Sequence, residues 1–428
     1  MSVARDTHTL APAANSAKSS AMSRVVPVSA ITQSQRSIRA GGGTAEDIRD
    51  RNLSSLLGWL HRDGALSRAE LTRLSGLNRS TVGVVIGDLV ALGLVSEGPA
   101  VVNGAGRPSS VVVPDAATVA IAVNPEVDAL NVGLVGFSGR VLRRARIPWS
   151  GPVSVDEVVQ ATAAVVAGMT SDTEVPWRII GAGIAVPGQV RLSDGLVREA
   201  THLGWSEEPL AAKMSAALGV PTQAANAAAL ALRAESAFGA GRDADDLFYI
   251  IGGASGIGGG AVIGGRLALG ANGHAGEVGH IFVADNGRLC HCGASGCFET
   301  EVSRDELLAA LELPIAQADF LAERLRMSED PAVVAVLERY RVILRRVVST
   351  VVNLFNPSTI IIGGFLASVI DGIDPGDIVG ESIRSAREDL RVLTGSTDVD
   401  LLLVGAAELV FSELIASPSA LTGGLQQI

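Results

Sequence analysis

Four residues of the types that bind metal ions lie close together in this 428-residue sequence. They are all three cysteines of the chain, Cys290, Cys292 and Cys297, together with His280, ten residues before the first. Thiolate sulfur and imidazole nitrogen are ligands with which proteins hold tetrahedral Zn²⁺. Because four protein ligands leave no coordination position open to water, the pattern predicts a closed structural site more than a catalytic one.

The residues between the cysteines determine whether the three thiolates can reach one metal ion. Gly293 and Gly296 permit the tight turns that three converging thiolates need. His291 lies between two cysteines and is expected to point away, so His280 is the better fourth ligand. Three cysteines cannot all pair with one another, and in a cytosolic chain a metal site is expected before a disulfide framework. The alternative is three buried cysteines with free thiols.

Residues 44–115 carry the signals of three short helices followed by two β-prone runs, which the segment NGAGRPS joins. The first helix is expected over residues 45–61. Ser67 and Glu70 have the capping-box spacing, which predicts that a second helix begins there. Asn78 is a good N-cap for a third helix. The apolar residues of this third helix share one face: Val82, Val85, Ile86 and Leu89.

A helix, a tight turn and a second helix, followed by a β-hairpin, are the elements of a winged helix-turn-helix, which binds DNA through the start of its second helix. An arginine between glycine and proline in the hairpin is expected to enter a minor groove. The alternative is a three-helix packing module that binds no DNA. The candidate DNA contacts are Ser67, Arg68, Asn78, Arg79, Ser80, Thr81 and Arg107.

Residues 116–428 alternate apolar strand-like runs with helical segments, which predicts a layered α/β body. Helices are expected at residues 156–169, 226–238 and 333–354. Residues 1–43 are expected to form a disordered tail. We see neither a signal-peptide pattern nor a membrane-spanning apolar run, so a cytoplasmic protein that spans no membrane is expected. The net charge of −11 argues against general coating of nucleic acid, but it leaves room for a small DNA-binding head.

Two segments resemble the signature of a known family. GASGIGGGAVIGGRLALGANGHAGEVGH and the following CHCGASGC are similar to motifs of the ROK family (repressors, open reading frames, kinases). The resemblance covers about residues 45–410. It implies a two-lobed actin-like or hexokinase-type body with a sugar cleft, a structural zinc ion, and homodimers or homotetramers. Family members with an added N-terminal winged helix-turn-helix are transcription regulators, and others are sugar kinases.

The resemblance also implies roles for single residues. The zinc ligands of the family fall on His280, Cys290, Cys292 and Cys297. Its sugar-binding positions fall on Gly188, Gln189, Thr201, Gln223, Glu277, His280 and Glu299. Carboxylates at such positions suit sugar hydroxyls, because one carboxylate can accept two strong hydrogen bonds.

Two positions depart from what a kinase of this family needs. When the sequence is aligned on its Ala-Ala-Ala-Leu run, the Asn-Asp pair of the family falls on Gln223 and Ala224, and alanine cannot accept a proton from a sugar hydroxyl. The first phosphate-binding turn of the family falls on residues 124–127, Asn-Pro-Glu-Val. This turn has no glycine and brings a negative charge to where phosphates would lie. We therefore expect no ATP binding and no catalysis.

Together these features predict a sugar-responsive transcription regulator, most simply a repressor of carbohydrate genes, which binds double-stranded operator DNA as a homodimer or homotetramer. A sugar between the lobes would move the heads, provided that it binds the two arrangements unequally. One alternative is an ATP-dependent hexose or N-acetylhexosamine kinase with a regulatory DNA-binding head. Another alternative is a regulator that a protein partner controls.

Overall fold

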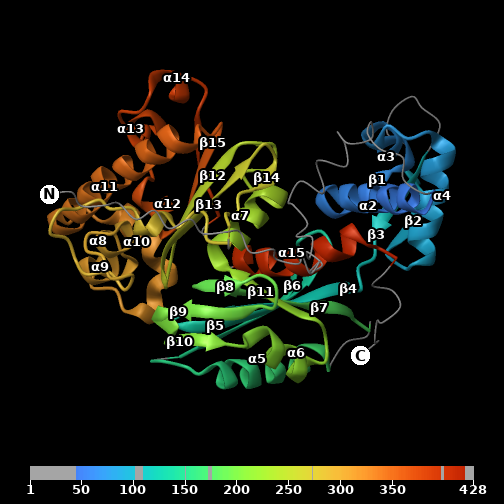
Figure 1. Cartoon of the computed structure of the whole chain (residues 1–428), viewed down its shortest axis with the longest axis horizontal. Coiled ribbons are helices and arrows are strands. Elements are labelled where there is room, and N and C mark those ends of the chain that lie inside the picture. The colour runs from blue at the N-terminus through green and yellow to red at the C-terminus, as the bar shows by residue number, and fades with distance from the viewer. Residues whose placement is uncertain are drawn as a thin grey trace, which may run out of the picture.

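The computed structural model describes residues 45–101, 109–149, 151–171, 176–271, 273–396 and 400–419. The predicted tail of residues 1–43 and the predicted DNA contact Arg107 lie outside the described residues. The chain folds into a helical head and a body of two lobes, each built on a five-stranded sheet (Figure 1). The head lies at one side of the body, against the C-terminal helix.

The head consists of three helices and a three-stranded sheet of order β1-β3-β2. Its elements are α2 (Ala45–Asp63), β1 (Leu66–Ser67), α3 (Arg68–Ser75), α4 (Arg79–Ala91), β2 (Val95–Val101) and β3 (Ser109–Pro114). The predicted caps are confirmed: Ser67 and Glu70 form a capping box at α3, and the Asn78 side chain accepts the N–H of Thr81 at the start of α4. Gly76 ends α3 with a φ of 68°, a left-handed conformation that glycine adopts without strain.

The first lobe is a mixed sheet of order β11-β7-β4-β5-β6. Its strands are β4 (Thr118–Pro125), β5 (Ala129–Gly136), β6 (Val141–Pro148), β7 (Arg178–Val186) and β11 (Thr222–Asn226). A small antiparallel sheet contains β8 (Gln189–Arg191), β9 (Leu196–Ala200) and β10 (Trp205–Glu208). The helices of this lobe are α5 (Val155–Thr170), α6 (Leu210–Leu218) and α7 (Ala227–Phe238). Strands β4 and β5 are buried along their whole length, because helices cover both faces of the sheet.

The second lobe is built around a sheet of order β14-β13-β12-β15-β16. Its strands are β12 (Leu247–Gly253), β13 (Gly256–Ile263), β14 (Arg266–Leu267), β15 (Thr359–Gly364) and β16 (Arg391–Thr394). Its helices are α8 (Phe298–Glu301), α9 (Arg304–Ala310), α10 (Leu321–Met327), α11 (Pro331–Phe355), α12 (Phe365–Val369), α13 (Pro375–Val379) and α14 (Arg384–Arg387). In the part of the chain that the structure describes, no helix combines the length and apolar character needed to cross a bilayer.

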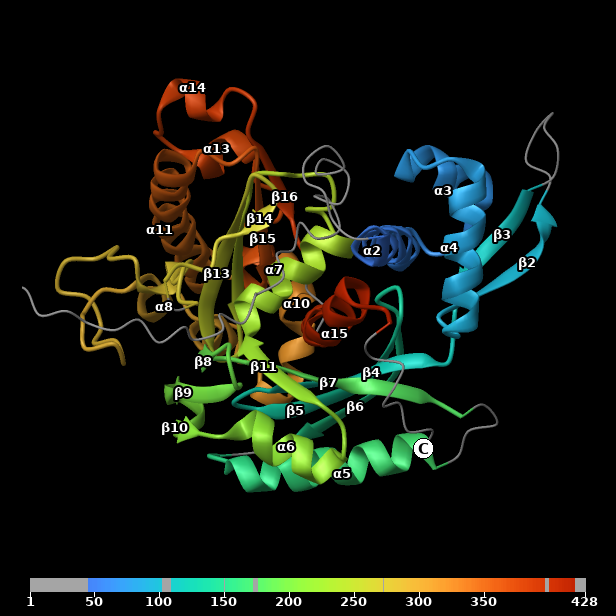
Figure 2. The ribbon, with the colours of Figure 1, turned by 45° about the vertical axis from the view of Figure 1, so that its right-hand side comes forward.

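Helix α15 (Asp400–Ala416) returns from the second lobe and joins the body to the head. It packs on α7 and on strands β4 and β7, and α2 of the head lies on its other side (Figure 2). One continuous apolar core therefore runs from the head through α15 into the first lobe. Its members include Leu57, Ile86, Phe137, Leu403 and Phe411. Because these side chains are buried together, the head is packed onto the body and shares its hydrophobic stabilisation.

Candidate functional site

The predicted metal ligands converge in the second lobe. His280 ends the 3-10 turn Val278–His280, and the three cysteines lie in the loop that leads into α8. The ligand atoms of the four residues all lie within 4.8 Å of one another. His280 Nδ1 is 3.6 Å from Cys290 Sγ, and Cys292 Sγ is 3.7 Å from Cys297 Sγ.

These separations fit a tetrahedral zinc ion. Zn–S bonds of about 2.3 Å place two sulfur atoms about 3.8 Å apart, and a Zn–N bond of about 2.0 Å places nitrogen and sulfur about 3.5 Å apart. Burial raises the pKa of the Cys290 and Cys297 thiols. A bound cation would therefore be what holds both groups as thiolates.

A second set of four ligands overlaps the first. The ligand atoms of His280, Cys290, His291 and Glu299 also lie within 4.8 Å of one another. His291 Nδ1 is 3.1 Å from Glu299 Oε1, so the prediction that His291 points away is wrong. The prediction assumed the side-chain alternation of extended backbone, but the N–H of Gly293 bonds the carbonyl of Cys290 at 3.0 Å and makes a turn here.

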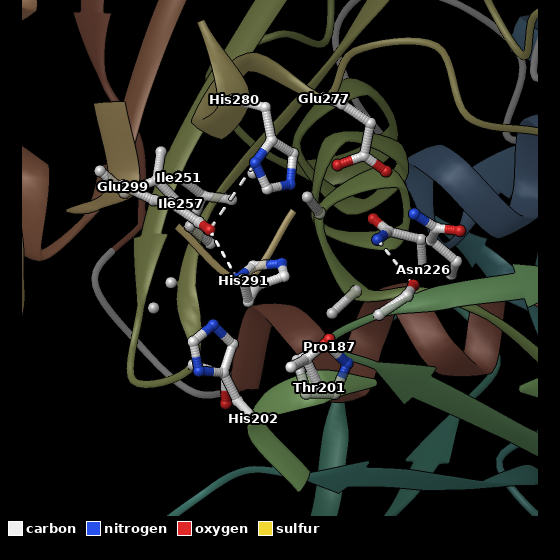
Figure 3. A pocket seen from close by; sticks show the side chains of 18 of the residues that line it. Pro187, Thr201, His202, Asn226, Ile251, Ile257, Glu277, His280, His291 and Glu299 are labelled. Atoms are coloured by element: carbon white, nitrogen blue, oxygen red, sulfur yellow. Dashed lines mark hydrogen bonds and ion pairs between the residues drawn. The ribbon is translucent and has the colours of Figure 1, made fainter. Parts of the chain in front are cut away.

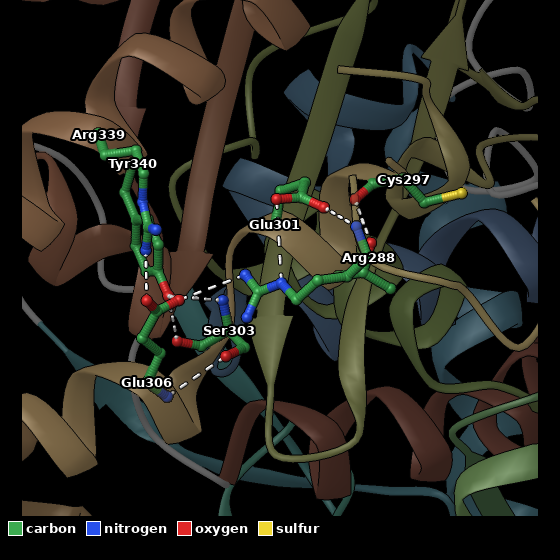
Figure 4. Close-up of polar contacts among 8 residues, drawn as sticks. Arg288, Cys297, Glu301, Ser303, Glu306, Arg339 and Tyr340 are labelled. Carbon is green, nitrogen blue, oxygen red and sulfur yellow. Dashed lines mark hydrogen bonds and ion pairs between the residues drawn. The ribbon is translucent and has the colours of Figure 1, made fainter. Parts of the chain in front are cut away.

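A network of polar groups anchors the cysteine loop to the helices beside it (Figure 4). Glu301 of α8 accepts the backbone N–H of Arg288 at 2.6 Å. Glu306 of α9 binds the side chains of Arg288, Arg339 and Tyr340 at 3.3, 2.5 and 2.8 Å. Burial alone would raise the pKa of Glu306, but the hydrogen bonds from Arg339 and Tyr340 outweigh burial and hold this pKa below its usual value. The network therefore holds the metal ligands in place against α9 and α11.

A cavity of about 370 Å³ lies between the two lobes, beside the metal cluster (Figure 3). This volume is in the range of sites for small molecules. The first lobe contributes the turn between β7 and β8, the 3-10 turn Thr201–Leu203 and the start of α7. The second lobe contributes the β12–β13 hairpin and the cysteine loop. The polar side chains that line the cavity are those of Glu126, Gln189, Glu199, Thr201, His202, Asn226, Ser255, Glu277, His280, His291 and Glu299.

The structure brings most of the predicted sugar-binding residues to this cavity. Those that line it are Gly188, Gln189, Thr201, Glu277, His280 and Glu299. Glu277 and His280 face it from the second lobe, and Thr201 faces it from the first (Figure 3). Glu299 is nearly buried and lies against Gly256, where a Cβ would stand 2.8 Å from Glu299 Oε2. Gly256 therefore makes room for the carboxylate and also adopts a φ of 128°.

Gln223 is the one predicted sugar-binding residue that does not line this cavity. Its position shows that the Asn-Asp pair of the family, which opens a helix, was aligned with the wrong residues of this chain. Gln223 and Ala224 are strand residues of β11 and line a different cavity, where the Gln223 side chain bonds Glu413. The residues that open α7 are Asn226, its N-cap, and Ala227, and both line the interlobe cavity. The alignment was misled because it rested on one short alanine run, and alanine occurs at many positions of this segment. The predicted helix start at Asn226 was the signal for the correct register.

Sequence reasoning also missed His202, which lies next to Thr201 in the lining. The ring centroid of His202 is 4.9 Å from that of His291, which in turn is 5.1 Å from that of His280. Burial lowers the pKa of His202 and so favours the neutral imidazole. A neutral imidazole both donates and accepts one hydrogen bond, which suits a sugar hydroxyl.

The turn after β4 places a carboxylate at the meeting point of the lobes. Glu126 is only 7% exposed, and its carboxylate accepts a hydrogen bond from the hydroxyl of Ser255 in the β12–β13 turn. The N–H of Val127 donates to the same hydroxyl oxygen at 3.4 Å. Burial raises the pKa of Glu126, and the hydrogen bond from Ser255 opposes that change. Next to this turn, Arg304 of the second lobe pairs with Asp128 of the first at 3.2 Å.

The predicted DNA contacts that the structure describes lie around the starts of α3 and α4. Ser67 and Asn78 use their side chains to cap the two helices, and Asn78 also accepts the Ser80 hydroxyl at 2.6 Å. Arg68 Nε donates to Glu97 of β2 at 3.1 Å, which ties α3 to the hairpin. Arg79 is exposed.

A buried hydrogen-bonded pair joins the head to the body. His61 Nε2 of α2 lies 2.7 Å from Glu408 Oε1 of α15, and the two side chains are 0% and 2% exposed. The N–H of Ser138 donates a hydrogen bond to His61 Nδ1 at 3.2 Å, so Nδ1 is an acceptor. Nε2 therefore carries the hydrogen and donates it to the Glu408 carboxylate in a hydrogen bond. The ring packs among Phe137, Phe238 and Phe411, with centroids 4.4, 5.2 and 5.3 Å away.

Comparison with known proteins confirms the resemblance of the sequence motifs. The ROK family model matches residues 120–386. The xylose repressor of Bacillus subtilis is 27% identical over 322 residues, which cover 74% of this chain and 82% of the repressor. The structure of a ROK family glucokinase from Streptomyces griseus, in complex with glucose and AMPPNP, has a TM-score of 0.59 and 29% identity, and covers 69% of this chain and 99% of the kinase.

A solved ROK family transcriptional regulator, a homologue of the Escherichia coli MLC protein, has the same fold. Its TM-score is 0.69 at 24% identity, and the match covers 88% of this chain and 100% of the regulator. The family model alone matches more than half of the chain. With its two-lobed α/β body and its paired glycine and cysteine motifs, the protein belongs to the ROK family.

Proposed function

We propose that the protein is a sugar-responsive transcription regulator, most simply a repressor, which binds operator DNA through its head. The observation that carries the proposal is that two helices which reach the interlobe cavity, α7 and α15, also pack against the head at His61. The xylose repressor among the relatives supports the same assignment. Such a regulator would act in the cytoplasm, with a sugar as its effector and a structural zinc ion beside the cavity.

The head has the element order of a winged helix-turn-helix, with α3 and α4 as the helix pair and β2–β3 as the wing. Arg79 stands exposed at the start of α4 and makes no hydrogen bond or ion pair that the described part of the chain shows. Its guanidinium is therefore available for a phosphate or a base edge. Two heads of a homodimer would bind the two halves of a pseudo-palindromic operator.

Replacing Arg79 with alanine is expected to weaken operator binding by about 1–3 kcal/mol, which is roughly five- to 150-fold. Because the side chain is exposed, the fold and the sugar affinity should not change. Fluorescence anisotropy with a labelled operator at fixed salt measures the effect. Arg324→Ala, an exposed arginine of α10 in the second lobe, is the matched control. Equal losses in both variants would show that the start of α4 is not the DNA-binding surface.

A physical route leads from the cavity to the head. Asn226 and Ala227 at the start of α7 line the cavity, and Phe238 at its end contacts the His61 ring. Twelve residues of helix span about 18 Å, so α7 bridges this distance as one stiff element. Helix α15 runs beside it, with Leu402 at the cavity and Glu408 bonded to His61. A sugar that moves either helix would therefore move the surface on which α2 rests.

The competing function is an ATP-dependent sugar kinase, which the similarity to a glucokinase favours. Two features weigh against it. The position that follows Asn226 at the helix start is Ala227, which has no carboxylate to accept a proton from a sugar hydroxyl. Pro125 ends β4, and the turn that follows contains Glu126 and no glycine. A coupled assay of ADP release across hexoses and N-acetylhexosamines would decide between the two functions. Sustained sugar-dependent turnover would contradict the proposal that the protein is a regulator without kinase activity.

The direct test of the proposal is a binding titration with DNA fragments from the genomic neighbourhood of the gene, with and without candidate sugars. We expect selective binding to at least one fragment, and a sugar-dependent change of about five- to 150-fold in affinity, the usual range of coupling between two sites. No selective DNA binding with any sugar would contradict the proposal. Selective binding that no sugar alters, but a cell-extract protein does, would point to control by a partner.

A further inference from the structure

We infer that the cavity accepts an uncharged sugar and rejects the phosphate ester of that sugar, and that Glu126 is a residue which enforces this choice. The inference rests on the proposed sugar response and adds the chemical class of the effector. It follows from the charge of the lining and from the position of one buried carboxylate.

The charged side chains that line the cavity are negative. Four carboxylates face it, those of Glu126, Glu199, Glu277 and Glu299, and the described lining residues include no lysine or arginine. A zinc ion would not reverse this sign, because the three thiolates that bind it outweigh its two positive charges. A phosphate monoester carries about −1.5 to −2 charges at neutral pH and would meet repulsion from both lobes.

Two donors that could bind a phosphate at the meeting point of the two hairpins are already in use. Backbone N–H groups and hydroxyls of tight turns are common phosphate ligands. Here the Ser255 hydroxyl donates to Glu126, and the N–H of Val127 is directed at the Ser255 oxygen. The buried carboxylate of Glu126 thus takes the place of an anionic ligand at the Ser255 hydroxyl. Even in its protonated form the side chain fills this space, so exclusion does not depend on its charge alone.

The start of α7, a second place where anions commonly bind, is also occupied by a side chain of the protein. Asn226 Oδ1 accepts the N–H of Ala229 at 3.1 Å, and Asn226 Nδ2 donates to the carbonyl of Gly188 at 3.0 Å. Four of the polar groups that face the cavity are carboxylates, which only accept hydrogen bonds when ionised, and Glu277 has no hydrogen-bond partner in the described part of the chain. Sugar hydroxyls are the donors that such acceptors require.

The experiment is isothermal titration of the zinc-loaded full chain with glucose, xylose and N-acetylglucosamine, and with the phosphate esters of the same sugars. For the sugar that binds, we expect its ester to bind at least about a hundredfold more weakly. Glu126→Gln removes the charge and keeps the size, whereas Glu126→Ala removes both. We expect the ratio of sugar affinity to ester affinity to fall in Glu126→Gln and to fall further in Glu126→Ala. Glu329→Gln, an exposed residue before α11, should leave the ratio unchanged.

The outcomes separate this inference from the proposed function. An ester that binds wild-type protein as tightly as its parent sugar would refute the inference that the cavity rejects phosphate esters. The proposed response to sugar would not be affected by that result. An unchanged ratio in both Glu126 variants would refute the role of Glu126. If sugars and esters all fail to bind, and DNA affinity responds to none of them, then the proposed sugar response fails and the inference fails with it.

Discussion

Replacing Cys297 with serine is expected to empty the zinc site and to abolish sugar binding. Structural zinc sites in small peptides contribute about 10–16 kcal/mol on binding, which exceeds the margin by which most domains are stable. Loss of one thiolate would release the loop that leads into α8. Glu299 of α8 lies two residues after Cys297 and lines the cavity, so it would lose its position as well. Zinc content by mass spectrometry should fall from one ion per chain toward zero. Calorimetry should show a lower melting temperature, and titration should show no sugar binding.

Matched variants decide which of the two overlapping ligand sets holds the ion. If His280 and the three cysteines bind zinc, His291→Ala and Glu299→Gln should keep one ion per chain, although Glu299→Gln should lose sugar affinity. If zinc disappears with His291→Ala and persists with Cys297→Ser, the set that contains Glu299 is the metal site.

Replacing His61 with alanine is expected to destabilise the protein and to uncouple the head from the sugar. Removing one partner of a buried pair costs about 3–5 kcal/mol, because the other partner stays buried without compensation. Here the unpaired group would be Glu408, which is 2% exposed, and the three phenylalanines around the ring would border a void. Chemical denaturation measures the stability loss. Titrations with sugar and with DNA should show normal sugar affinity and a DNA affinity that the sugar no longer changes.

Two comparisons separate coupling from simple loss of stability. Glu408→Gln keeps an oxygen that can accept the His61 proton, so it should lose less stability and retain part of the sugar response. Arg49 lies on the same helix as His61, is 59% exposed and forms a surface ion pair with Asp88 of α4. Arg49→Ala should change neither the stability nor the sugar response measurably. A His61→Ala protein that still releases DNA on sugar binding would refute the route through α7 and α15.

Local signals were enough to predict several parts of the structure. The capping box at Ser67 and the N-cap at Asn78 depend on residues three positions apart, so the sequence alone contains the whole interaction. The cysteine cluster was predictable for the same reason, because its three thiols lie within one short loop. His280 required only the expectation that a fourth ligand completes a tetrahedron.

Contacts between distant parts of the chain were not predictable in this way. Glu126 meets Ser255 across 129 positions, and His61 meets Glu408 across 347. Neither pair has a spacing that a pattern could detect, because the fold alone brings them together. The misplaced Gln223 shows a different limit: a short alanine run leaves the register of an alignment open, and the expected helix start at Asn226 should have been given more weight.

The apolar core that the head shares with the body limits how this protein can be recombined with its relatives. A cut at residue 115 would respect the order of the elements, yet it would divide one core into two halves and expose Phe137, Leu403 and Phe411 of the body. A chimera that carries a foreign head would need a first helix of matching shape, with a hydrogen-bond donor opposite Glu408. DNA specificity is therefore expected to be exchanged more safely at the exposed residues of α4 than by transplanting the whole head.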